Sequence, residues 1–172
     1  MKRASIPQSL QPNLGTAEPR GAPEYRSVKA ISITQPIATL AAHSELVAMP
    51  CEFRTDYRGK LAIHASQRVC DAAWRLCFES EIMAALARAL VLHPSKLTRQ
   101  AFIAIVELKD VKLMSRTLVE ELPEIDALVA SNLQSKFLWY IEAPKRLSEP
   151  IFMSGELGLW MASLPYPLEF LE

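Results

Sequence analysis

Short apolar runs separated by polar turns divide this chain into alternating strands and helices. Residues 28–34 place isoleucines on one face and small or polar side chains on the other, which is the pattern of a half-buried strand. The Gln35-Pro36 dipeptide follows, and proline suits the first turn of a helix, so we expect a short apolar helix over residues 37–46. The polar residues 51–58 then predict an irregular connection.

Further apolar runs predict the rest of the secondary structure. Leu61-Ala62-Ile63 indicates a short buried strand, and Ser66 after it suits the N-cap of a following helix. Residues 144–150 are rich in turn formers, so we expect a crossing there. The expected strands are 28–34, 61–63, 101–113, 137–142 and 151–153, and the expected helices are 37–46, 67–79, 82–92 and 117–132, the last interrupted at Pro123.

The order of these elements predicts one folded domain with a tail. Strands, then helices, then strands again indicate an α+β domain over residues 28–172, built on a mostly antiparallel sheet or a small barrel. The helical block at about 66–92 is an insert between strands. Residues 1–27 hold four of the twelve prolines and two of the five glycines without apolar periodicity, which predicts a flexible N-terminal tail.

Composition places the chain among globular proteins. Its residues are 50% hydrophobic, which excludes disorder for most of the chain. No apolar run approaches the ~18 residues of a membrane helix, and the first residues lack the apolar core of a secretory signal. The three cysteines, without CxxC spacing, favour a reduced, cytoplasmic setting. The three histidines are scattered, so we expect no zinc site. No other metal and no cofactor is expected.

Net charge is zero, but the charges are unevenly distributed along the chain. Residues 54–116 contain 11 Lys and Arg against 6 Asp and Glu, a balance of +5. Residues 117–172 contain 3 against 9, a balance of −6. A local basic patch can bind phosphates even in a neutral protein, although a dipolar surface without function has the same composition.

The stretch from Tyr57 to Ser66 is the most informative part of the sequence. Gly59, between Arg58 and Lys60, indicates a tight turn, and His64 lies where the buried strand leads into the expected helix. Such junctions expose backbone N–H groups and favour anions. Two interpretations stay open for each side chain. Arg58 and Lys60 either contact phosphate or are solvated, or Arg58 clamps backbone carbonyls; His64 either binds a ligand or is buried and hydrogen-bonded.

Other candidate ligand contacts lie outside this stretch. Arg54 adds positive charge nearby, or is a solvated loop residue. Gln35 could hydrogen-bond a base edge or cap the first helix. Trp139 and Tyr140 are adjacent on one expected strand and point to opposite faces, so one of them could stack on a base while the other is core.

Five segments of the chain together resemble a known family. They are KAISITQP (29–36), YRGKLAIHAS (57–66), FIAIVELKDV (102–111), FLWYIEAP (137–144) and GELGLW (155–160). As a set they resemble the ASCH domain, a family of the PUA-like superfamily of small RNA-binding barrels. The resemblance implies a PUA-like small curved β-barrel with helices between strands, and a cleft beside the first helix that binds RNA or modified nucleosides.

Active members of that family carry a G-x-K-x-x-E/T-x-R motif after the first helix. By ungapped counting its four positions fall here on Ser44, Leu46, Met49 and Cys51, so the motif is degenerate. The lysine and its acidic partner would supply proton transfer and charge stabilisation, which Leu46 and Met49 cannot do. No histidine neighbours Cys51 in sequence to activate its thiol.

These observations favour a non-catalytic module that binds nucleic acid, RNA in preference to DNA, or a nucleotide in a basic cleft. The predicted contacts are Arg54, Arg58, Lys60, His64, Ser66 and Gln35. One alternative is a divergent amidohydrolase or nuclease acting on a modified nucleoside or RNA. Another is a protein-interaction adaptor that binds its partner through the acidic segment 117–132.

Overall fold

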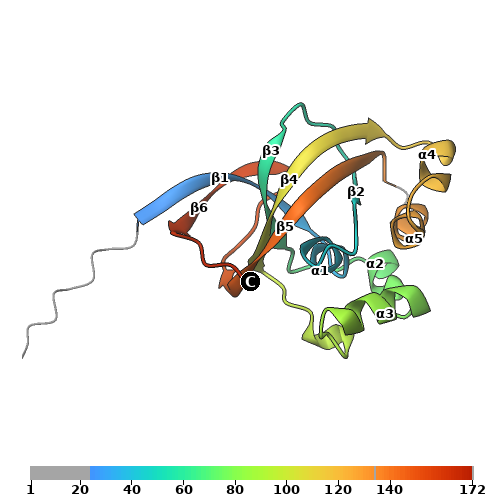
Figure 1. Ribbon diagram of the computed structural model, residues 1–172, viewed down its shortest axis with the longest axis horizontal. Helices are drawn as coiled ribbons and strands as arrows, with labels where there is room; N and C mark the ends of the chain where they lie inside the picture. The colour runs from blue at the N-terminus through green and yellow to red at the C-terminus, as the bar shows by residue number, and fades with distance from the viewer. Residues whose placement is uncertain (1–23, 134, 172) are drawn as a thin grey trace, which may run out of the picture.

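The computed structural model describes residues 24–133 and 135–171, which form a curled six-stranded sheet with helices packed against it (Figure 1). The strand order is β2-β5-β4-β3-β1-β6, and only the β1–β3 pair within these residues is parallel. The strands are β1 (Glu24–Ile33), β2 (Ala48–Cys51), β3 (Gly59–Ala65), β4 (Ala101–Leu113), β5 (Phe137–Phe152) and β6 (Leu159–Tyr166). The helices are α1 (Ile37–Ala42), α2 (Asp71–Leu76), α3 (Ser80–Arg88), the 3₁₀ helix η1 (Pro94–Lys96), α4 (Arg116–Glu120) and α5 (Glu124–Leu133). The expected α+β class with a curved, barrel-like sheet is confirmed.

Strand β3 lies near the middle of the sheet and is buried on both faces. Leu61 and Ile63 join the main core with α1, while Ala62 joins a second, smaller core with Phe102 and Trp160. An apolar run of this length between turns is typical of a fully buried strand, because neither face meets water. The β3 backbone thus separates two cores, and each end of the strand emerges at a different part of the surface.

Helix α1 packs against the sheet and is buried along its whole length. The Gln35 side chain fixes its start: its Oε1 accepts the Thr39 N–H at 3.1 Å, and its Nε2 donates to the Thr98 carbonyl at 2.6 Å. The helix ends at Ala42, four residues before the predicted end. Ser44 has a positive φ of 60°, and the Glu45 N–H turns back to the Leu40 carbonyl at 2.9 Å, which stops the helix.

The helical insert begins later than predicted. Helix α2 starts at Asp71 with Cys70 in the N-cap position, so the prediction that Ser66 caps this helix is wrong. The Ser66 hydroxyl instead donates to the Arg68 carbonyl at 2.6 Å, within a non-helical segment.

Strand β5 is the largest departure from the predicted elements. Residues 144–150 are part of one continuous strand and not a turn, because β5 bends while it keeps pairing with β4. Three register shifts in that ladder and a positive φ of 48° at Ala143 accommodate the bend. Pro144 and Pro150 both lie in this part of β5. Pro50 lies in β2, an edge strand that was not predicted, and an edge strand tolerates a missing N–H.

The first strand begins at Glu24, which places residues 24–27 of the predicted flexible tail in the sheet. They pair with the end of β6, from Glu24 opposite Tyr166 to Ser27 opposite Ser163. No strand was predicted from the sequence at the position of β6. The rest of the predicted tail, residues 1–23, lies outside the described residues.

The acidic segment divides at Pro123 into α4 and α5, and Asp126 does not belong to its surface. Asp126 is 1% exposed, and its Oδ1 accepts the N–H groups of Val47 and Ala48 at 2.9 and 2.7 Å. The carboxylate fastens the start of β2 to α5. Of the four acidic residues expected on the face of this segment, Glu120, Glu121, Glu124 and Asp126, one is therefore in the core.

Substitution of Asp126 tests this fastening. Burial raises the pKa of the Asp126 carboxyl, so its contribution to stability is largest below the ordinary aspartate pKa and is lost as pH rises through the raised value. D126N keeps an oxygen acceptor but cannot ionise. As pH rises from about 4 to 7, we therefore expect the unfolding free energy of D126N to increase relative to that of the wild-type protein. D126A leaves the N–H groups of Val47 and Ala48 without their acceptor, the second of them buried, and should lose about 1–3 kcal/mol. Urea unfolding measures both, and a D126A protein as stable as wild type would contradict the assignment.

Candidate ligand-binding groove

The carboxyl ends of β1 and β3 lie side by side because these two strands are parallel. The pairing continues one residue beyond the strands, where the Ser66 N–H donates to the Ile33 carbonyl at 2.8 Å. Chain segments that leave parallel strands diverge, and crevices at such ends are common ligand sites. The surface here is hollowed in two adjoining places.

The first hollow, of about 270 Å³, lies beyond the end of β3, and the second, of about 390 Å³, lies beyond the end of β1. Both are lined by Ser32 and Leu157, so they are neighbours, and together we call them the β1/β3 groove. Polar side chains dominate the first hollow: Ser32, His64, Ser66, Gln67, Arg68, Gln100, Ser154 and Glu156. The second hollow has more apolar side chains, among them Ile33, Ile37 and Phe53. It also includes Thr34, Cys51, Glu52 and Cys70.

A hydrogen-bonded pair, Ser32 and His64, forms the floor of the first hollow. His64 Nε2 lies 2.9 Å from the Met153 carbonyl, which can only accept, so Nε2 carries the proton. Nδ1 is then an acceptor, and the Ser32 hydroxyl donates to it across 3.2 Å. His64 is 1% exposed and packs edge-on against Phe102 and Trp160. It is the buried, hydrogen-bonded histidine of one sequence interpretation, yet its partner Ser32 reaches the groove.

The loop from Ser154 to Gly158 covers this pair. A Cβ on Gly155 would lie 2.4 Å from both His64 Cε1 and Ser32 Oγ, so glycine permits the backbone to pass directly over them. Leu157, in the same loop, is 99% exposed. The loop thus forms one wall of the groove and keeps His64 from solvent.

The other predicted contacts do not join this groove. Gln35 is buried and caps α1, as one interpretation expected. Arg58 donates to the carbonyls of Thr55 and Tyr57 at 3.1 and 2.8 Å and pairs with Asp110 at 3.1 Å. It is therefore the backbone clamp of the other interpretation. Arg54 is largely exposed and lies 3.4 Å from the Asp56 carboxylate.

Lys60 lies at the opposite end of β3 from His64 and Ser66. Since a strand rises about 3.3 Å per residue, the ends of β3 are roughly 20 Å apart. Lys60 lines a different hollow, of about 630 Å³, together with Lys109, Glu107 and Glu142. The single basic cleft expected to hold Arg54, Arg58, Lys60 and His64 together is therefore not formed.

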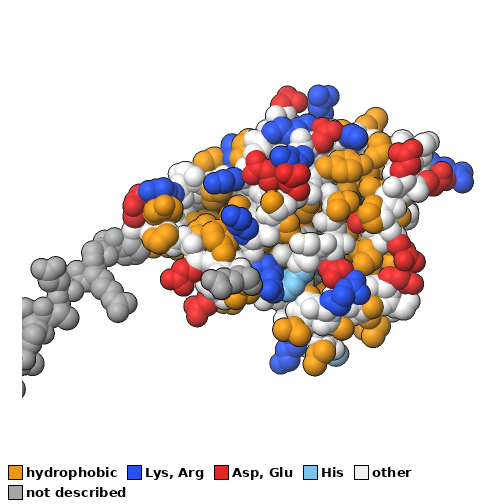
Figure 2. All heavy atoms as spheres, viewed as in Figure 1, with side chains coloured by type: hydrophobic (Ala, Val, Ile, Leu, Met, Phe, Trp, Pro, Cys, Tyr) orange, Lys and Arg blue, Asp and Glu red, His pale blue; other side chains and the backbone are white. Residues whose placement is uncertain are grey.

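Positive charge is also dispersed over the surface. Figure 2 shows Lys and Arg side chains interspersed with carboxylates on the face drawn, without one continuous basic patch. Ion pairs such as Arg88–Glu45 at 2.6 Å and Lys109–Glu142 at 2.8 Å account for part of the excess that the sequence shows between residues 54 and 116.

The four positions that ungapped counting aligns with the ASCH motif are mostly in the core. Leu46 and Met49 are 3% and 0% exposed and line neither hollow of the groove. Cys51 borders the second hollow but is 5% exposed, and burial raises the pKa of its thiol far above the ordinary range. A thiol that stays protonated is a poor nucleophile, so Cys51 does not replace the missing chemistry.

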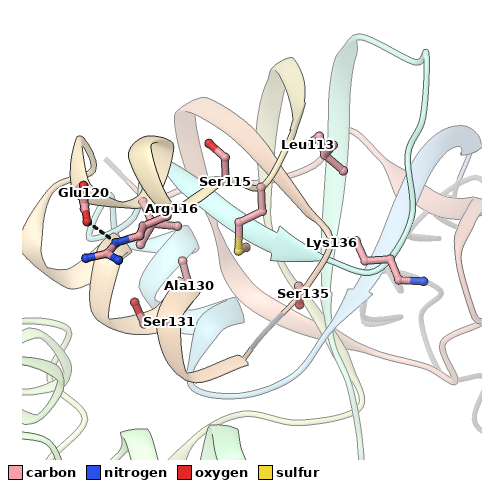
Figure 3. A pocket seen from close by; sticks show the side chains of 10 residues that line it. Leu113, Ser115, Arg116, Glu120, Ala130, Ser131, Ser135 and Lys136 are labelled. Carbon is pink, nitrogen blue, oxygen red and sulfur yellow. Dashed lines mark hydrogen bonds and ion pairs between the residues drawn. The ribbon is translucent and has the colours of Figure 1, made fainter.

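The acidic segment borders a further hollow, of about 610 Å³, between the end of β4, the two helices α4 and α5, and the start of β5. Figure 3 shows Arg116 reaching along α4 to Glu120, with which it forms an ion pair at 2.8 Å. With Asp126 buried and Glu120 paired, the exposed carboxylates that remain of the expected face are Glu121 and Glu124. This weakens the case for an acidic docking surface.

Several lining residues were not singled out from the sequence, namely Ser32, Gln67, Arg68, Gln100 and the loop 154–158. Gly155 was the available signal, since a glycine beside a strand end marks a close approach.

No protein-family model and no curated protein matches this chain. Across residues 24–133 and 135–171, no group of three or more His, Cys, Asp and Glu is arranged to hold a metal ion. None of the helices in the same residues has the length and apolar character to cross a membrane.

Substitution of Gly155 tests the close approach of the loop. In G155A the new methyl group overlaps His64 and Ser32, and we expect a loss of about 1–3 kcal/mol in unfolding free energy as the loop is forced outward. L157A is the matched control within the same loop, because an exposed side chain contributes little. Denaturant unfolding compares the two, and equal stability of G155A and L157A would show that the loop does not rest on the pair.

Proposed function

We propose that this protein is a non-catalytic module that binds RNA, in preference to DNA, or a nucleotide, and that its ligand lies in the β1/β3 groove. The observation that carries the proposal is the lining of the first hollow. Hydroxyl and amide side chains converge there beside Arg68, which is exposed and makes no ion pair with any described residue.

The chemistry of this lining matches a nucleoside. Ser66, Gln67 and Gln100 offer donors and acceptors for a base edge or a ribose hydroxyl, and Arg68 offers a charge for phosphate. The second hollow adds the partly buried ring of Phe53, next to apolar side chains. The two hollows, of about 270 and 390 Å³, suit a small ligand with one polar and one flatter, apolar part.

The absence of acid–base chemistry at the motif positions supports binding without turnover. Leu46 and Met49 are core residues, and Cys51 holds a protonated thiol. The resemblance to the ASCH domain points to the same ligand class, and it rests on the sequence segments alone.

A charge reversal at Arg68 tests the site. We expect R68E to weaken binding of a short single-stranded RNA, or of a mononucleotide, by about tenfold or more, because a phosphate contact becomes a repulsion. K60E makes the same charge change at the other end of β3 and serves as the matched control, with nearly wild-type affinity for a mononucleotide. Fluorescence anisotropy at several salt concentrations measures both. Equal weakening by the two variants, or none by either, would refute the groove as the site.

A second candidate function rests on the Ser32–His64 pair. With Nε2 held by Met153, Nδ1 is placed to take the Ser32 proton as Oγ attacks an acyl carbon. The proton then passes to the departing amine, and water hydrolyses the resulting ester. This would make the protein a divergent amidohydrolase on a modified nucleoside.

The serine itself distinguishes this candidate. If it holds, wild-type protein hydrolyses an N-acetylated cytidine and reacts with a fluorophosphonate probe, and S32A does neither while it still binds RNA. Mass spectrometry of the labelled protein reads the result directly. Absence of both turnover and labelling in the wild-type protein would exclude Ser32 as a nucleophile.

A further inference from the structure

A separate hollow, of about 240 Å³, lies at the end of α1 and shares no lining residue with the β1/β3 groove. We call it the α1/β5 hollow. Its nitrogen-bearing side chains are His43 at the end of α1, Lys96 in η1 and Arg146 in β5, with the hydroxyl groups of Thr39, Thr98 and Ser148 among them. We propose that the α1/β5 hollow binds an oxyanion of the phosphate or sulfate class.

The positions of His43 and Arg146 are the first support. Arg146 Nη1 lies 3.4 Å from His43 Nδ1 and 3.3 Å from Nε2, so a guanidinium lies against a ring that can itself carry a positive charge. Two such groups in contact repel one another when both are charged, unless an anion lies between them. The contact is a hydrogen bond while the imidazole is neutral, and a third, negative group is needed to stabilise it once the ring is protonated.

The lining of the hollow is the second support. None of its described residues is a carboxylate. The acid nearest His43 in sequence is Glu45, and both of its oxygens are held by Arg88, at 2.9 and 2.6 Å. Arg146 makes no ion pair with any described residue. The positive charge of the hollow is thus not neutralised by the part of the protein that the structure describes.

The walls of the hollow strengthen any charge interaction within it. Ala42, Val91 and Leu147 supply apolar surface, and apolar surroundings lower the local dielectric constant. The end of α1 would oppose an anion weakly, but the carbonyls of Thr39 and Leu40 already accept the N–H groups of His43 and Glu45. Hydroxyl donors and two or three cations against apolar walls are a suitable environment for a tetrahedral oxyanion.

Anion binding and His43 protonation must then be linked. Burial, and after it the charge of Arg146, lowers the pKa of His43, while Glu45 acts weakly in the opposite direction. The other charged groups near it are Lys96 from η1 and Arg88 from α3, the latter paired with Glu45. A bound anion stabilises the imidazolium, so it raises the His43 pKa, and the affinity for the anion rises as pH falls through that pKa.

NMR titration of the histidine rings tests the site in the full chain. Sulfate is the first probe, because its charge is constant over the pH range in which His43 titrates. We expect the His43 pKa to be about one unit higher in sodium sulfate than in sodium chloride of equal ionic strength. The ring signals of His93, which lies outside the hollow, provide the internal reference for a general salt effect.

Two variants of equal charge change complete the test. R146Q removes the central cation. The His43 pKa in chloride should then rise, because the charge of Arg146 lowers it in the wild-type protein. The difference between the His43 pKa in sulfate and in chloride should disappear. K109Q removes a lysine that pairs with Glu142 away from the hollow, and should keep the full sulfate effect. An identical His43 pKa in the two salts for the wild-type protein, or an undiminished sulfate effect in R146Q, would overturn the proposal.

A further pair of probes identifies the source of the anion. A shift with inorganic phosphate but not with single-stranded RNA at equal phosphate concentration assigns the hollow to a small free anion. A shift with RNA assigns it to a backbone phosphate. Both outcomes support the site, and both are independent of the groove, whose own test depends on Arg68.

Discussion

The parallel pairing of β1 with β3 is the constraint on which the rest of this structure depends. Five residue pairs, from Lys29 opposite Leu61 to Ile33 opposite Ala65, align the two strands. Parallel neighbours cannot be joined by a tight turn, so the chain between them must cross over the sheet. Residues 34–58 make this crossing, and they contribute α1 to the main core and β2 to the far edge of the sheet. The groove exists because both strands end at the same place.

Buried polar side chains hold this crossing in position. Gln35 joins the start of α1 to the segment before β4, and Asp126 joins α5 to the start of β2. His64 joins the end of β3 to the carbonyl of Met153. Each satisfies backbone or side-chain groups that would otherwise be buried without partners, which is costly. These residues therefore stabilise the fold, and the side chains left to contact a ligand are their neighbours, such as the half-buried Ser32 and the exposed Arg68.

The charged side chains also divide into those that stabilise the fold and those open to a ligand. The basic excess of the middle of the sequence is consumed in part by clamps and ion pairs, of which Arg58 with Asp110 is the most connected. Among the cations that make no ion pair with a described residue, Arg68 lies in the groove, and Arg146 and Lys96 line the α1/β5 hollow. A small ligand in the groove and an oxyanion in the hollow would thus occupy separate sites that share no lining residue.

Elements with a local pattern could be predicted from the amino-acid sequence. The strand at 101–113 was predicted at its observed bounds, since its alternation needs no partner to be visible, and the break at Pro123 follows from proline geometry. The capping role of Gln35 and the burial of His64 were also among the expected interpretations. Only the tertiary structure decided the continuous β5, the start of β1 at Glu24 and the contact of Ser32 with His64. These features depend on strand register and on contacts between residues at least 32 positions apart in the sequence. A local pattern of apolar and polar residues does not show which strands become neighbours.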